Sequence, residues 1–436
     1  MRLLTFKGGV HPEDKKELAG LAPIERIKPP EIVYLPLSQH TGVPSKPIIE
    51  KKDEVEVGMK IAESDGKLSV PLHSSVAGVY MGLVNYPHPL GGRKLAMKIK
   101  VDPERTEEWK SDEKEVGTLS NKDIIKIVKE SGIVGMGGAA FPTFFKMQPP
   151  PDKKIADLII NGAECEPYLT ADYRLMIERA EDILKGIDII RRVINPDRVW
   201  IAIESNKMDA VERMKEVSSS YPSFNISIHK TKYPQGSEKQ LVQAVKRQEV
   251  PEGGLPFDAG AYVQNIGTAL AVYEAVCYSK PLYERVVTVT GSVRDPSNFL
   301  VPIGTPFDYL IEKAGGVIGT LMKVINGGPM MGIAQVYPEV PVIKGTTGIL
   351  IQNREEVFSG IVSPCIRCAA CIDVCPMCLM PTEINKSIET ENFDKAEEMG
   401  VLSCMECGGC AYVCPSNIPL VQQFKYAKNE IMKRRK

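Results

Sequence analysis

Apolar and polar positions along the middle of the chain alternate between the patterns of buried strands and of helices. The run over 155–160 and the segments RVWIAIES and FNISIH are typical of strands that are buried on both faces. Amphipathic stretches over 171–194 and 209–217 predict helices between these strands, and a further helix follows YPQGSEKQLVQAV. Because strands that alternate with helices predict a parallel sheet covered on both faces, we expect one α/β domain over 118–282.

Shorter elements are expected before this domain. Residues 31–100 hold short apolar segments separated by glycines and prolines, a pattern that resembles the barrel-sandwich hybrid fold of biotinyl and lipoyl carriers. Lys67 lies near the position of a carrier lysine, but the tip reads SDGKLS, so we expect a docking or spacer module without covalent modification. His73 and His88 have no second ligand at metal spacing and are interpreted as structural residues.

Composition narrows the functions that this chain can carry. The 436 residues have a formal net charge of -1, so no overall basic field indicates binding to nucleic acid. No window approaches about 18 consecutive apolar residues, and the first residues lack the apolar core of a secretory signal. We therefore expect a soluble cytoplasmic chain that reaches a membrane only through partners. The basic tail KNEIMKRRK is interpreted as a solvated helix end rather than a lipid contact.

Eleven cysteines in such a chain favour metal binding over disulfides, because reducing compartments keep thiols free. Eight of them form two runs of C-x2-C-x2-C-x3-C-P, the bacterial ferredoxin pattern, in which the fourth cysteine binds the other cluster. One 4Fe-4S cluster is therefore assigned to Cys365, Cys368, Cys371 and Cys414. The second cluster is assigned to Cys404, Cys407, Cys410 and Cys375. Zinc knuckles are the alternative, but zinc sites usually place a longer gap between two cysteine pairs. Cys378 is interpreted as a packing residue.

A glycine-rich loop, SGIVGMGGAAFPTFFKM, permits close approach of the backbone to a phosphate or to the edge of an isoalloxazine. It follows the helical stretch SNKDIIKIVKES and not a strand, which argues against a Rossmann dinucleotide fingerprint. Glu164 and Glu166 follow the strand over 155–160, at the end where α/β folds bind ligands. Their alternative interpretation is as caps of a helix that begins near Thr170. Asn265 and Thr268 are expected in a loop before a helix of small residues.

Four segments in this order, GMGGAAFPTFFK, NGAECEP, YPQGSEKQL and QNIGTA, resemble the flavin and NADH site of the flavoprotein subunit of respiratory complex I. With the N-terminal extension and the two cysteine runs, the whole chain resembles the RnfC family of the Rnf (Rsx) electron transport complexes. Three positions depart from complex I, because Met136, Ala163 and Ser237 stand where its loops carry charged residues. Polar contacts to a nucleotide are therefore expected to be weaker here.

The resemblance implies which residues contact FMN and NADH. For the glycine loop these are Gly135, Gly137, Gly138, Ala139 and Phe141, with Lys146 near a flavin or nicotinamide phosphate. Asn161, Glu164 and Glu166 match the acidic flavin loop, and Glu166 lies where the family contacts NADH. Tyr233, Gly236 and Glu238 match the next loop, whereas Asn265 and Thr268 match the loop that reaches the FMN phosphate.

The remaining segments complete the expected multidomain α/β and α+β fold. Residues 285–345 resemble the β-grasp (SLBB) domain of the complex I flavoprotein, and their GGPMMG is interpreted as a packed turn, with a backbone surface facing flavin and cluster as the alternative. One helix, EINKSIETENFDKAEEMG, is expected between the cysteine runs. The predicted domains are an N-terminal extension with a barrel-sandwich hybrid (1–105), a Rossmann-like FMN/NADH domain (118–282), a β-grasp domain (283–352) and a helical di-cluster ferredoxin domain (358–430).

By resemblance, the chain is expected to be an electron-transfer subunit of a membrane-bound, ion-translocating ferredoxin:NAD oxidoreductase of the translocase class. NADH would reduce FMN and the clusters would pass single electrons on, with no catalytic side chain required. The expected partners are membrane-embedded and flavin-bearing subunits and a ferredoxin or iron-sulfur subunit, at the cytoplasmic face of the membrane, with sodium or proton transport coupled through them. The alternatives are a soluble NADH:ferredoxin-type oxidoreductase component and an iron-sulfur relay with a vestigial flavin site.

Overall fold

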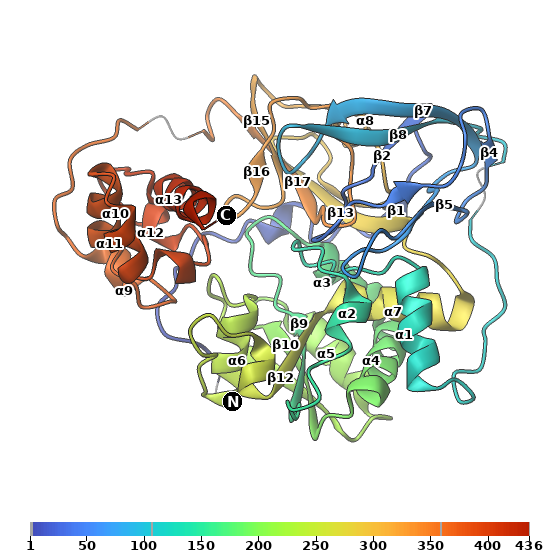
Figure 1. The fold of residues 1–436 in the computed structure, drawn as a ribbon, viewed down its shortest axis with the longest axis horizontal. Helices are drawn as coiled ribbons and strands as arrows, with labels where there is room; N and C mark the ends of the chain where they lie inside the picture. The colour runs from blue at the N-terminus through green and yellow to red at the C-terminus, as the bar shows by residue number, and fades with distance from the viewer. Residues whose placement is uncertain (1–2, 106–107, 358–359, 436) are drawn as a thin grey trace.

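The α/β part of the chain is built on a four-stranded parallel sheet with the order β11-β10-β9-β12. In this computed structural model, which describes residues 3–105, 108–357 and 360–435, its strands are β9 (Asp157–Gly162), β10 (Arg198–Glu204), β11 (Phe224–His229) and β12 (Ala261–Asn265). Ile159, Ile160 and Ile201 are completely buried because helices cover both faces of the sheet (Figure 1). The predicted parallel sheet is therefore confirmed.

The helices of this part are α1 (Asn121–Glu130), α2 (Thr143–Lys146), α3 (Ala171–Glu178), α4 (Ala180–Ile194), α5 (Met208–Ser218), α6 (Glu238–Lys246) and α7 (Ile266–Tyr278). The single helix predicted over 171–194 is broken at Arg179, where the backbone leaves the helical region. Small residues let α7 approach α4 closely, since a Cβ on Gly186 would lie 1.9 Å from the carbonyl oxygen of Ala269. Thr268 lies in the first turn of α7, and not in the preceding loop as predicted, because Asn265 already caps the helix.

Two small sheets form the N-terminal part. One consists of β2 (Ile32–Pro36), β8 (Arg93–Val101), β7 (Gly78–Pro87) and β4 (Glu54–Val55), and the other of β3 (Lys46–Pro47), β5 (Lys60–Glu63) and β6 (Leu72–His73). Leu35, Ile61 and Met97 belong to the core of this part. Lys67 lies exposed in the turn between β5 and β6. The ring of His88 is buried and hydrogen-bonded to the Ser38 carbonyl at 2.8 Å, which is a structural role.

A six-stranded mixed sheet with the order β1-β14-β13-β17-β15-β16 follows the α/β part. Its strands are β1 (Ile24–Arg26), β13 (Glu284–Gly291), β14 (Ser297–Pro302), β15 (Leu321–Asn326), β16 (Ile333–Ala334) and β17 (Gly348–Asn353), with helix α8 (Phe307–Lys313) in the same core. Strand β1 comes from the N-terminal extension, and Leu4 pairs with His229 of the α/β sheet. The stretch expected as one unit, residues 1–105, therefore contributes to several sheets.

The C-terminal part is helical and lies to one side of the molecule (Figure 1). It contains α9 (Ala370–Asp373), α10 (Pro381–Glu389), α11 (Phe393–Glu398), α12 (Gly409–Tyr412) and α13 (Leu420–Arg434), around a core that includes Ile384, Phe393 and Phe424. The single helix predicted between the cysteine runs is two helices, because Glu391 has a positive φ and Asn392 caps α11. Residues 358–359, which the predicted boundary of this domain includes, lie outside the described part of the chain.

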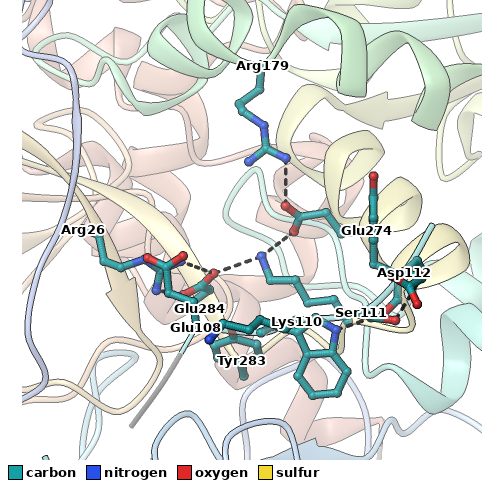
Figure 2. Close-up of a pocket in the computed structure, with 12 residues that line it drawn as sticks. Arg26, Glu108, Lys110, Ser111, Asp112, Arg179, Glu274, Tyr283 and Glu284 are labelled. Carbon is teal, nitrogen blue, oxygen red and sulfur yellow. Dashed lines mark hydrogen bonds and ion pairs between the residues drawn. The ribbon is translucent and has the colours of Figure 1, made fainter.

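An ion-pair network joins the α/β part to the six-stranded sheet around a cavity of about 630 Å³ (Figure 2). The ammonium group of Lys280 lies 2.9 Å from a carboxylate oxygen of Glu274 and 2.9 Å from one of Glu284. Arg26 also pairs with Glu284, at 2.7 Å, and Arg179 pairs with Glu274 at 3.1 Å. Since the buried Glu284 and the partly buried Glu274 are both paired, the network fixes the junction of the two parts.

Candidate functional site

The glycine loop is fixed from several sides while one side stays open. The amide of Met136 donates to Oγ1 of Thr268 at 2.9 Å. The carbonyl of Met136 accepts a hydrogen bond from Arg285 at 3.2 Å. Thr41 of the N-terminal part donates its hydroxyl to the carbonyl of Ala139 at 3.0 Å. At Gly138, where φ is +110°, an added Cβ would meet no described atom within 4 Å. The loop is thus a fixed backbone surface with an open face.

The N-terminus of α7 lies beside this open face. Asn265 caps the helix by accepting the amide of Thr268 at 3.1 Å, and its side-chain nitrogen donates to Asp172 at 2.6 Å. A Cβ on Gly137 would be 3.5 Å from the Cβ of Asn265, so the loop and the helix N-terminus are in contact. A helix N-terminus carries partial positive charge and free amides, which suit a phosphate. The residues present therefore fit the phosphate end of FMN.

Glu164, one of the two predicted site carboxylates, caps a helix. It accepts the amides of Asp172 at 2.7 Å and of Tyr173 at 3.2 Å, in the first turn of α3. Its side chain is 7% exposed, and burial raises the pKa of this carboxyl to about 7 although the Lys16 ammonium lowers it. The structure thus gives Glu164 the helix-capping role that was the alternative interpretation of this residue.

Glu166, the second carboxylate, is bound by the backbone of the β-grasp segment GGPMMG. It accepts the amides of Met330 at 3.1 Å and Met331 at 2.8 Å, and a Cβ on Gly328 would lie 2.3 Å from its carboxylate. Burial raises the pKa of Glu166 to about 7, while the hydrogen bonds from the amides of Met330 and Met331 lower this pKa. Met330 also packs against the loop of Cys407. The segment is therefore a backbone surface between the acidic loop and the cysteine runs, and not only a packed turn.

Other predicted site residues are tied to one another. The side-chain amide of Asn161 donates to the carbonyl of Gly236 at 2.8 Å, which joins the acidic loop to the loop over 233–238. Lys146 forms an ion pair with Glu238 and lies 5.6 Å from the centre of the Tyr262 ring. The 161–166 loop and the 233–238 loop therefore meet at the carboxyl end of the sheet, where α/β folds bind ligands.

Several charged residues at this end of the sheet were not predicted. Lys16, from the N-terminal segment, donates to the carbonyls of Glu166 at 3.1 Å and Leu169 at 2.5 Å. Lys207 and Glu204 form a buried pair at 3.3 Å, and Arg285 is also buried. These residues come from parts of the chain that are far apart in sequence and belong to no short motif. The pattern of the sequence held no signal that could have found them.

Four of the predicted cluster cysteines line one cavity of about 820 Å³. They are Cys365, Cys368, Cys371 and Cys414, three from the first run and the last from the second. Cys365 and Cys368 are exposed, and two exposed apolar side chains, Val362 at 59% and Ile366 at 67%, line the same cavity. This first cavity therefore opens to the surface.

A second, narrower cavity is lined by Cys375, Cys404, Cys407 and Cys410. Burial raises the pKa of the Cys407 thiol to about 11, and the neighbouring thiols of Cys404 and Cys375 raise it further. Cys378 is exposed and lines neither cavity. No three Cys, His, Asp or Glu side chains among the described residues come together as ligands of a single metal ion; the eight thiols instead surround two cavities in the crossed grouping that two cubanes require.

The second cavity adjoins the predicted flavin loops. The hydroxyl of Tyr233 donates to the carbonyl of Cys407 at 2.8 Å, and Tyr233, Val10 and Cys407 form one buried cluster with Cys165 packed against it. Gln240 of α6 donates to the carbonyl of Pro376 at 3.2 Å. The cavity of Cys407 is therefore proximal to the sheet, whereas the cavity of Cys365 is distal.

Comparison with known families finds four matches in chain order. They are the RnfC barrel sandwich hybrid domain over residues 4–104, the Nuo51 FMN-binding domain over 128–274, the SLBB domain over 286–334 and the 4Fe-4S dicluster domain over 361–415. The predicted fold class is thereby confirmed. The chain combines an FMN-binding domain with a dicluster iron-sulfur domain, which excludes the zinc-knuckle alternative.

Curated relatives match along the whole chain. The C subunit of the proton-translocating ferredoxin:NAD(+) oxidoreductase complex of Clostridium ljungdahlii is 43% identical over 98% of this chain and 94% of its own length. The C subunit of the Na(+)-translocating complex of Acetobacterium woodii is 41% identical over 99% and 98%. A chain of an NAD+-reducing [NiFe]-hydrogenase shares the fold, with a TM-score of 0.52 and 17% identity over 71% of this chain and 63% of that one. The chain belongs to the RnfC family, the C subunits of the ion-translocating ferredoxin:NAD+ oxidoreductase (Rnf) complexes, and is an electron-transfer subunit.

Proposed function

We propose that FMN binds on the open face of the glycine loop, between the N-terminus of α7 and the two loops at the carboxyl end of the sheet. The glycine loop would contribute Gly135, Gly137, Gly138, Ala139 and Phe141. The surrounding contacts would come from Lys146, Asn161, Glu166, Tyr233, Gly236, Glu238, Asn265 and Thr268. The observation that carries the proposal is the convergence of four separate motifs around one open backbone surface.

The clusters would extend from this site in a fixed order. Tyr233, from one of the flavin loops, bonds to Cys407, which supports Cys375, Cys404, Cys407 and Cys410 as ligands of the proximal cluster. Cys365, Cys368, Cys371 and Cys414 would then hold the distal cluster, in the cavity that opens to the surface. Bound FMN supplies the chemistry that converts the two-electron exchange with NAD(H) into single-electron exchange with clusters.

Partners would meet the chain at the distal cavity. Two exposed apolar residues of its lining, Val362 and Ile366, support contact with an iron-sulfur or flavin-bearing subunit of the same complex. No helix of the described residues is long and apolar enough to cross a membrane. In our proposal, membrane-embedded subunits of the same complex hold the chain at the cytoplasmic face. The two relatives differ in the ion that their names give, so sodium and protons are equal candidates.

An anaerobic optical and EPR titration of the reconstituted full chain with NADH tests this proposal, after FMN and iron have been counted. Bleaching of the flavin followed by cluster signals is the expected result. In Glu166→Gln, NADH oxidation should fall while both cluster signals remain. Unchanged NADH oxidation in this variant would remove the assigned role of Glu166.

A second candidate, an iron-sulfur relay with a vestigial flavin site, is favoured by one observation. The carboxylates of Glu164 and Glu166 are already occupied by backbone amides, so neither is free to bind a nucleotide without exchanging partners. If the full complement of iron is present but NADH reduces nothing, while reduced ferredoxin reduces the clusters, the relay function replaces the first proposal.

A further inference from the structure

The N-terminal segment over 3–18 crosses the carboxyl end of the α/β sheet. Leu4 pairs with the end of β11, since its amide donates to the carbonyl of Ile228 at 2.9 Å. Val10 and Tyr233 exchange two backbone hydrogen bonds, at 2.8 and 2.9 Å. Figure 1 shows this segment in blue, running from near α6 past the C-terminal helices. We call it the strap, and it lies over the loops to which the nucleotide site is assigned.

Near its end, the strap carries a buried lysine whose side chain contacts the acidic loop. Lys16, in a short 3-10 helix (Lys16–Leu18), is 9% exposed. Its ammonium group donates to the carbonyls of Glu166 and Leu169, at the middle and the end of the loop over 163–170, and lies 3.9 Å from the carboxylate of Glu164. The Lys16 side chain therefore holds the loop over 163–170 together, although this loop lies about 150 residues further along the chain.

The surroundings of Lys16 explain why a charged group is kept there. Its ammonium faces the carboxylates of Glu164 and Glu204, the thiol of Cys165 and the ammonium of Lys207, and Asp172 and Glu166 complete the group. Burying an ammonium group that is not hydrogen-bonded to a carboxylate costs free energy. This cost is offset where the positive charge stabilises nearby carboxylates. Lys16 also lines a small cavity with Cys165, Glu204 and Tyr233, at the end of the sheet where ligands bind.

We propose that Lys16 is a positioning residue of the nucleotide site, which holds the acidic loop in place and balances its carboxylates so that Glu166 is presented to a nicotinamide nucleotide. The proposal rests on the proposed function for the role of Glu166. The position of the loop itself does not depend on that function, because it follows from the two carbonyl contacts of Lys16.

The test uses the reconstituted full chain and three variants. Lys16→Met keeps the length of the side chain and removes its charge, and Lys16→Arg restores a charge. Lys15→Met is the matched control, since Lys15 is the neighbouring residue and pairs with Glu13, at 2.7 Å, near the surface. Hydrogen–deuterium exchange of the amides over 163–170, FMN and iron content, and the pH dependence of NADH oxidation are measured for each.

In Lys16→Met, exchange over 163–170 should rise and KM for NADH should rise on the order of tenfold, with kcat, FMN and iron close to the wild type. The acid limb of the pH profile should move to higher pH, because the Lys16 ammonium lowers the pKa of both Glu164 and Glu166. Lys16→Arg should recover part of both effects, and Lys15→Met should show neither.

Unchanged exchange in Lys16→Met would overturn the proposal, as would an equal effect in Lys15→Met. Loss of FMN and iron together with a lower Tm would make Lys16 a residue of the general fold and would also overturn it. If NADH fails to reduce the wild-type flavin, the proposed function fails. The exchange data then decide the role of Lys16 by themselves.

Discussion

At the scale of single residues, Glu164 and Glu166 show that two carboxylates one residue apart can have unrelated tasks. Glu164 faces the N-terminus of α3, where the helix amides and partial positive charge stabilise it. Glu166 faces backbone amides of another domain. The positive φ of 44° at Glu164 turns the chain between these two directions. A motif such as NGAECEP therefore predicts where acids lie but not which of them stays available to a ligand.

The raised pKa of Glu166 predicts how the stability of the chain depends on pH. A carboxyl whose pKa is 4.5 in the unfolded chain and about 7 in the folded chain binds its proton more tightly when folded. Its contribution to stability is complete below pH 4.5 and is lost as the pH rises through 7. The unfolding free energy of the wild type should therefore fall between pH 5 and pH 8. In Glu166→Gln we expect this fall to be smaller by about 2 kcal/mol.

Chemical denaturation of the anaerobic protein at pH 5 and pH 8 measures this difference. Glu383→Gln, at an exposed glutamate of α10, is the control. In this variant the unfolding free energy should fall between the two pH values as much as in the wild type. A Glu166→Gln variant whose stability falls with pH as steeply as that of the wild type would show that the folded carboxyl does not have a raised pKa.

The crossed grouping of the cysteines makes a separate prediction. Cys375 is the last cysteine of the first run but lines the cavity of the second run, so Cys375→Ser should damage the proximal cluster and spare the distal one. About half of the iron and one of two EPR signals should be lost. Cys378→Ser is the matched control, because Cys378 lies three residues further on, is exposed and lines neither cavity. Loss of the distal signal in Cys375→Ser would reverse the assignment.

At the scale of elements, the glycine loop owes its position to helix α7 and to neighbouring domains. Thr268, in the first turn of α7, accepts the amide of Met136, and both groups are buried. Thr268→Val would leave that amide without a partner, which costs about 1 to 3 kcal/mol of stability. We expect this variant to retain less FMN after gel filtration than the wild type.

Thr290 of β13 is a suitable control for this effect. It is as completely buried as Thr268, but its hydroxyl has no hydrogen-bond partner in the part of the chain that the structure describes. Thr290→Val should therefore keep the wild-type FMN content and stability. FMN retention in Thr268→Val equal to that in Thr290→Val would show that the bond to Met136 does not hold the loop in place.

The elements also show how far the sequence could predict the site. The strands and helices of the α/β part follow from hydrophobic periodicity, and the cysteine spacing predicts which thiols share a cavity, because both signals are local in the chain. Arg285 and Lys16 carry no such signal. Each is a single charged residue that reaches the site across more than a hundred positions, so only the packing of the domains brings it there.

At the scale of the whole molecule, the strap is the feature that connects the electron-transfer parts. It pairs with the α/β sheet at Leu4, bonds to the C-terminal part where the amide of Gly9 donates to Val374 at 2.8 Å, and ends in the acidic loop at Lys16. The flavin loops and the proximal cysteines are therefore positioned by the same short segment. The distance for electron transfer between the flavin loops and the proximal cluster therefore depends on contacts made by the strap, which belongs to neither the α/β part nor the C-terminal part.

Gly8 offers a test of this coupling. Its φ is +77°, and an added Cβ would lie 2.8 Å from the carbonyl oxygen of Cys375, so Gly8→Ala should displace the proximal cysteine loop from the sheet. We expect slower reduction of the proximal cluster after flavin bleaching in stopped-flow measurements with NADH, at unchanged iron and FMN content. The positive φ alone costs about 1 to 2 kcal/mol of stability.

Gly253→Ala separates the strain of the backbone from the contact with Cys375. Gly253 has a φ of +67°, but an added Cβ would meet no described atom within 4 Å, so this control carries a similar strain without the clash. If Gly8→Ala alone slows the cluster step, the strap sets the spacing between flavin loops and proximal cluster. Equal rates in the two variants would mean that the contact of Tyr233 with Cys407 is sufficient to hold the proximal cluster in place.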